Sequence, residues 1–116
     1  MKKVVIINFV LLLMMATMAK AQLTGEWKGD NGACYKIRQI GSQIFWSMDD
    51  RPRVINVFVG YIAGNTIAGT WADLPGGNIQ GSGTLALKIE SNNKLVKIDE
   101  TGNYLGSVHI KSGNGN

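Results

Sequence analysis

The sequence has little of what most catalytic and metal sites require. It contains one cysteine, Cys34, and one histidine, His109, among 116 residues. A single cysteine excludes an internal disulfide and a zinc site built from cysteine pairs, and no serine–aspartate pattern accompanies the histidine. The acidic turns contain no EF-hand pattern. We therefore expect no enzyme activity, no cofactor and no metal.

The beginning of the chain is basic and then apolar. Residues 2–3 are lysines, residues 4–19 are largely apolar, and residues 19–21 read Ala-Lys-Ala. This order is typical of an export signal with a small-x-small cleavage site. The apolar run is shorter than the roughly 20 residues of a membrane span. We expect a signal peptide over 1–21 and a periplasmic or extracellular protein that meets the membrane only through that signal, with an uncleaved anchor as the alternative.

Most of the positive charge lies in this segment. The chain has 12 basic and 8 acidic residues, and three of the lysines lie within 1–21, so residues 22–116 have 9 basic residues and a net charge of +1. No cluster of Lys and Arg with interleaved aromatics remains, and we expect no nucleic-acid partner. The mature length allows one domain, over 22–111, with a flexible tail at 112–116.

Strand patterns fill the mature chain, and long helical periodicity is absent. All 15 glycines and both prolines follow residue 21. Alternating apolar and polar residues between Gly, Asn and Asp predict strands. We expect eight, at roughly 24–28, 33–40, 43–48, 54–63, 66–72, 82–90, 94–99 and 104–111.

Three two-residue turns, at 41–42, 64–65 and 92–93, predict how six of these strands pair. The pairs include Ile37 with Trp46, Phe58 with Trp71, Asn56 with Asp73, Ile89 with Val96, and Leu87 with Ile98. The last register points Lys97 outward. A slip of one residue would reverse the two faces of a strand.

The other connections, near 28–32, 49–53, 73–78 and 99–103, are longer. Successive turns of a meander alternate between its ends, so the tight turns share one end and the long loops share the other. Six of the eight acidic residues lie in or beside the long loops. Eight strands with few edges predict a small antiparallel up-and-down β-barrel, with a β-sandwich as the alternative.

The first expected strand resembles a known motif. Gly25-Glu26-Trp27 is similar to the G-x-W signature of the calycin superfamily, which includes the lipocalins and avidins. The resemblance implies a barrel in which Trp27 closes the blind end and a basic residue of the last strand, here Lys111, lies over its ring. Both residues would then be structural.

The segment 23–33, LTGEWKGDNGA, further resembles the opening of avidin and streptavidin. The resemblance places Gly29 and Ala33 where that family has an asparagine and a serine that bind biotin. Neither residue has a polar side chain. The resemblance therefore implies an avidin-like shape without these biotin ligands.

The long-loop end is the candidate binding surface. Trp46, Asn56, Trp71 and Asp73 are expected on the inner face near these loops. Aromatic rings beside an amide and a carboxylate suit a small-molecule or carbohydrate-like ligand, such as a glycan. No residue is assigned a catalytic role.

The alternative function is a protein-interaction module, such as a secreted protease inhibitor or an oligomeric surface protein. An inhibitor would use the N-terminal segment 22–24, which is short. A homo-oligomer would use an outward apolar stripe on the fourth strand, formed by Ile55, Val57, Val59 and Tyr61. We expect His109 on a surface or groove, and Cys34 as an outward thiol near the open end.

Overall fold

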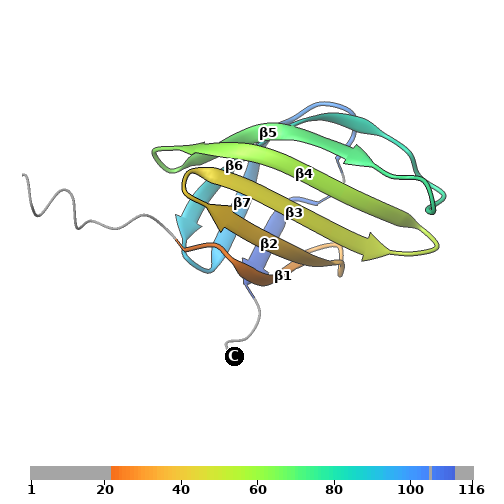
Figure 1. Ribbon diagram of the computed structural model, residues 1–116, viewed down its shortest axis with the longest axis horizontal. Helices are drawn as coiled ribbons and strands as arrows, with labels where there is room; N and C mark the ends of the chain where they lie inside the picture. Colours follow the sequence, from red (N-terminus) through yellow and green to blue (C-terminus); the bar gives the residue numbers. More distant parts are fainter. Residues whose placement is uncertain (1–21, 105, 112–116) are drawn as a thin grey trace, which may run out of the picture.

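Eight antiparallel strands follow one another around a closed β-barrel in the computed structural model, which describes residues 22–104 and 106–111 (Figure 1). They are β1 (Gly25–Gly29), β2 (Cys34–Ile40), β3 (Gln43–Asp50), β4 (Val54–Ala63), β5 (Thr66–Asp73), β6 (Ser82–Ser91), β7 (Lys94–Glu100) and β8 (Val108–Lys111). Strand β8 pairs with β1 and closes the barrel. The predicted up-and-down barrel is confirmed, and the β-sandwich is wrong.

The expected export signal at 1–21 and the expected tail at 112–116 lie outside the described residues. Within the described ranges, no helix is long and apolar enough to cross a bilayer.

The turns give the barrel two different ends. In Figure 1 the β2–β3 and β4–β5 turns lie at the left, and the β3–β4 and β5–β6 connections lie at the right. Gly41 and Gly64 begin their two-residue turns with φ values of 61° and 62°. Glycine adopts this left-handed conformation without steric cost, and it gives the turn the twist that a β-hairpin needs. We call the left end the tight-turn end and the right end the long-loop end.

Two of the three predicted registers are confirmed. Ile37 pairs with Trp46 across β2 and β3. Phe58 pairs with Trp71 and Asn56 with Asp73 across β4 and β5. Alternate residues of these strands therefore point into the barrel, as the sequence predicted.

The third predicted register, between β6 and β7, is wrong by one residue. The structure pairs Ile89 with Leu95 rather than Val96, and Leu87 with Lys97 rather than Ile98. The turn at 92–93 is as predicted, but the register shifts immediately beyond it. A β-bulge adds one residue to a strand and so reverses the faces that follow. The Lys97 side chain is consequently only 19% exposed, whereas Ile98 is 54% exposed.

The last strand is shorter than predicted. The sequence pattern started it at residue 104, whereas β8 begins at Val108. Gly102 and Asn103 both have positive φ values, of 83° and 64°, which turn the chain out of the extended conformation. Residues 101–104 and 106–107 lie outside the strands instead, and the Tyr104 side chain is buried.

The tight-turn end is closed by the N-terminal segment 22–24. Leu23 and Trp27 are fully buried, and the Trp27 Nε1 donates to the Leu23 carbonyl oxygen at 2.8 Å. The Leu23 amide donates to Oε1 of Gln39 at 3.0 Å, beside the 41–42 turn. The backbone amide of Gln22 donates to Oδ1 of Asn92 at 3.3 Å, in the 92–93 turn. The segment therefore ties two hairpins together across the barrel.

Trp27 and Lys111 are opposite each other in the β1–β8 register. The Lys111 side chain passes over Gly25, where an added Cβ would lie 2.8 Å from its Cε. Its ammonium donates to the Gln22 carbonyl oxygen at 3.1 Å. Lys111 thus holds the N-terminal segment over the same end that Trp27 fills.

Candidate functional site

A pocket of about 320 Å³ opens at the long-loop end of the barrel. All four long connections reach it, and its rim carries the polar side chains of Asn31, Arg53, Gln80 and Asn103. The interior farther from this mouth is filled by large apolar side chains, among them Ile44, Ile67, Leu85, Leu87 and Leu95. The cavity is therefore a pocket at one end and not a channel through the barrel.

Three of the four predicted binding residues, Asn56, Trp71 and Asp73, line this pocket. Trp46 is not among the residues that line it; its ring stacks on Phe58 with centroids 4.4 Å apart. The Trp46 Nε1 donates to Oδ1 of Asn56 at 2.9 Å. Trp46 is thus linked to the pocket through the lining residue Asn56.

Asp73 is the anionic group of this wall. Its Oδ1 accepts a hydrogen bond from Nδ2 of Asn56 at 2.9 Å, and its Oδ2 accepts one from the Gly81 amide at 2.9 Å. The Asp73 amide donates back to the Gly81 carbonyl oxygen at 2.8 Å. The carboxylate is thus fixed by neutral donors, and no ion pair to it occurs among the described residues. Each of its oxygens keeps a further acceptor position.

The Trp71 ring is held between two strands and a loop. Its Nε1 donates to the carbonyl oxygens of Thr84 and Thr101, at 3.2 and 3.1 Å. Its ring meets Tyr104 edge to face, with centroids 5.4 Å apart. The side chain is 4% exposed, so it offers the pocket a fixed aromatic surface.

Tyr104 is a pocket residue that sequence reasoning missed, since residue 104 was expected to begin the last strand. Its hydroxyl donates to the Tyr35 hydroxyl at 3.0 Å and lies 3.4 Å from Nε2 of His109. Burial, followed by Tyr35 and by the charges of Asp73 and Asp30, raises the pKa of Tyr104 far above its ordinary value. Burial likewise raises the pKa of Tyr35. Both phenols are therefore neutral donors at physiological pH.

The expectation that His109 lies on a surface or in a groove is wrong. Its side chain is fully buried, with its ring edge-to-face on Tyr35 at 4.5 Å and 5.5 Å from the Trp46 ring. Burial lowers the pKa of His109 to about 4, so the ring is neutral at pH 7. Its Nδ1 has no hydrogen-bond partner among the described residues. This histidine is therefore surrounded by aromatic rings and not by solvent.

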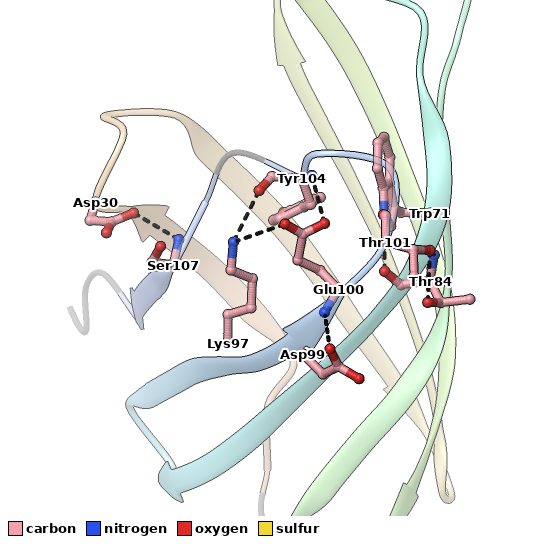
Figure 2. Close-up of polar contacts among 9 residues, drawn as sticks. All are labelled: Asp30, Trp71, Thr84, Lys97, Asp99, Glu100, Thr101, Tyr104 and Ser107. Carbon is pink, nitrogen blue, oxygen red and sulfur yellow. Dashed lines mark hydrogen bonds and ion pairs between the residues drawn. The ribbon is translucent and has the colours of Figure 1, made fainter.

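Side chains of β7 and of the β1–β2 connection bind the backbone of Tyr104 and Ser107 in the β7–β8 loop (Figure 2). Lys97 donates to the Tyr104 carbonyl oxygen at 3.0 Å, and Glu100 accepts from the Tyr104 amide at 3.2 Å. The amide of Ser107 donates to Oδ1 of Asp30 at 3.0 Å. The β6–β7 bulge is what points Lys97 toward this loop. Sequence reasoning missed this contact because the bulge was not expected.

Two further charged or reactive groups lie near the mouth. Arg53 is bound through Nε and Nη2 to the carboxylate of Asp50, so this rim cation already has an anionic partner. Cys34 is exposed at the start of β2, as expected. Within the part of the chain that the structure describes, no group of three or more His, Cys, Asp or Glu side chains could hold a metal ion.

Known protein families, curated proteins and solved structures were compared with this chain, and none of them matches it.

Proposed function

We propose that this protein is an exported, calycin-like β-barrel that binds a small ligand in the pocket at its long-loop end. The observation that carries the proposal is the pocket itself, which combines a fixed aromatic ring, Trp71, with a carboxylate, Asp73, in about 320 Å³. Small-ligand sites are commonly apolar hollows with a few placed polar groups, and pockets from about 300 Å³ upward hold such ligands.

The pocket is also built in advance of any ligand. Asn56 is 2% exposed, and its amide joins Trp46 to Asp73 by two hydrogen bonds. Trp71 is fixed by two carbonyl oxygens. Groups that are already ordered lose little conformational entropy on binding, which favours affinity for a small molecule.

The test is a screen of metabolites and oligosaccharides against residues 22–116, with tryptophan fluorescence and the indole N–H signals of ¹⁵N NMR spectra as readouts. A ligand of this pocket should shift the Trp71 and Trp46 indole signals. Trp71→Phe should weaken its binding about tenfold or more, because the larger ring surface is lost together with the N–H that holds the ring in place. Phe45→Leu, on the exposed outer face of β3, is the matched aromatic control and should leave binding unchanged. Binding that maps to the 22–24 segment would refute the choice of end.

A second candidate function, a homo-oligomeric surface protein, has one observation in its favour. Phe45 on β3 pairs with Val59 on β4, and these residues are 37% and 38% exposed beside Tyr61, which is 60% exposed. Exposed apolar groups side by side on a sheet favour association with another surface. Light scattering after size-exclusion chromatography tests this function. An oligomer that Val59→Lys dissociates would support it, and a monomer at high protein concentration would exclude it.

A further inference from the structure

We infer that the pocket selects ligands that carry a protonated amine, with the ammonium group beside Asp73 and an apolar or aromatic body against Trp71. This inference rests on the proposed small-ligand site and names its ligand class. It excludes neutral carbohydrates as the preferred ligands.

The first support is the electrical state of Asp73. Its two oxygens are bound only by an amide N–H of Asn56 and the backbone N–H of Gly81, and both donors are neutral. No cationic side chain among the described residues pairs with this carboxylate. Charge-assisted hydrogen bonds from N⁺–H donors are about twice as strong as neutral ones, so an ammonium gains more here than a hydroxyl does.

The second support is that the cations near the pocket already have partners. Arg53 is paired with Asp50. Lys97 is bound to the Tyr104 carbonyl oxygen and lies 3.9 Å from Glu100. Each of these cations has its own carboxylate nearby, so neither neutralises Asp73.

The field inside the pocket agrees with this account. The charges of Asp73 and Asp30 both raise the pKa of the Tyr104 hydroxyl, after the larger effects of burial and of Tyr35. The negative charges of Asp73 and Asp30 therefore contribute to the potential at Tyr104, whereas at Tyr35, where burial raises the pKa of the hydroxyl, the charge of Arg53 acts in the opposite direction and partly lowers it. A ligand cation would lie in that potential and near the rings of Trp71 and Tyr104, whose faces attract cations.

The third support is the hydrogen-bond inventory of the wall. The Asn56 oxygen already accepts a hydrogen bond from Trp46, and one Asn56 N–H donates to Asp73. The Trp71 N–H donates to two carbonyl oxygens. A sugar needs several donors and acceptors that are free to read its hydroxyl groups. Beside Trp71 the wall therefore offers mainly the remaining acceptor positions of one carboxylate, which suits a single cationic donor group, whereas the amides of Asn31, Gln80 and Asn103 lie at the rim.

The experiment compares three probes of nearly one shape on the unmodified protein, residues 22–116: 2-phenylethylamine, 2-phenylethanol and N-acetyl-2-phenylethylamine. Binding is followed by the Trp46 and Trp71 indole signals in ¹⁵N NMR spectra at low ionic strength. We expect the amine to bind about tenfold or more tightly than either neutral probe. Because no variant is involved, this comparison does not depend on how a substitution affects folding.

Two charge variants complete the test. Asp73→Asn should abolish the preference for the amine. Asp99→Asn, which removes an exposed carboxylate on β7 at the same end of the barrel, should leave the preference unchanged. An amine preference that persists in Asp73→Asn would overturn the inference.

The outcomes separate the ligand class from the site. If either neutral probe, or a neutral oligosaccharide, shifts the same indole signals with equal or greater affinity than the amine, the ligand class is wrong and the pocket remains a binding site. If no probe or sugar shifts either signal, the proposed binding function fails together with the inference.

Discussion

The two ends of this barrel are finished by different kinds of interaction. At the tight-turn end, Leu23 and Trp27 fill the interior, and the polar contacts of segment 22–24 involve backbone groups on at least one side. At the long-loop end, side chains bond to side chains, as in the Trp46–Asn56–Asp73 chain. Apolar burial needs no directional partner, whereas a polar network is stable only when its members are satisfied.

This difference separates stability from binding within a small protein. The tight-turn end has short turns and a plug, and it offers little chain from which to build a site. Among the described residues, the buried Nδ1 of His109 has no hydrogen-bond partner, and at the long-loop end the Asp73 carboxylate has neutral donors. We expect substitutions at the first end to change the free energy of unfolding most, and substitutions at the second end to change binding most.

The largest effect is expected for Trp27→Ala. The ring is fully buried and its N–H is bonded to Leu23, so its removal should lower the free energy of unfolding by about 3–5 kcal/mol. Urea unfolding followed by circular dichroism measures the loss. Trp71→Ala serves as the comparison at the other end. An unchanged midpoint for Trp27→Ala would show that this residue does not close the barrel.

The next effect is a loss of stability in acid caused by His109. Its pKa is 6.5 in the unfolded chain and about 4 in the barrel, so between these values the unfolded state binds the proton and the folded state does not. Above pH 6.5 His109 is neutral in both states and does not lower the free energy of unfolding. That free energy should fall by on the order of 3 kcal/mol as the pH drops to 4. Denaturant unfolding across this range, with His109→Gln as the variant, isolates the contribution. A wild type and a variant with the same pH dependence would contradict it.

The burial of His109 could not be predicted from the sequence. Local signals were sufficient for the hairpins, because turn glycines and alternating faces act over a few residues, and they placed Asn56 opposite Asp73. Apart from Tyr104, the ring partners of His109 come from β2 and β3, more than sixty residues away. A single histidine on a strand carries no signal of such long-range contacts.

The β6–β7 hairpin shows a second limit. The Asn92-Asn93 turn was identified, but one additional residue in the strand before it reverses the face of Lys97. The consequence reaches the pocket, because Lys97 and Glu100 then hold the loop that buries Tyr104. Bulges depend on how the barrel bends, which is a property of all eight strands together.

A smaller effect, confined to the long-loop end, is expected for Gly83→Ala. An added Cβ would lie 2.1 Å from the Thr101 carbonyl oxygen, which also accepts the hydrogen bond from Trp71. The loop must move, at a cost of about 1–3 kcal/mol. Hydrogen exchange should quicken in residues 101–107 while the segment around Trp27 keeps its protection. Equal loss of protection at both ends would show that the two ends are not independent.

The smallest effect is expected for Gly41→Asn, at the tight-turn end. Gly41 has a φ of 61°, and nothing lies within 4 Å of the position that a Cβ would take. Asparagine tolerates this left-handed conformation better than most residues, so the free energy of unfolding should change by no more than about 0.5 kcal/mol.

Gly102→Asn is its counterpart at the long-loop end, where φ is 83° but the Cβ would lie 2.1 Å from the Ser82 carbonyl oxygen. The two substitutions make similar demands on the backbone and differ in the space around it. Gly102→Asn should therefore lower stability more and weaken binding of 2-phenylethylamine, and Gly41→Asn should do neither. Equal losses in the two variants, measured by urea unfolding and NMR titration, would mean that backbone conformation and not the crowding of the pocket loops limits substitution at both ends.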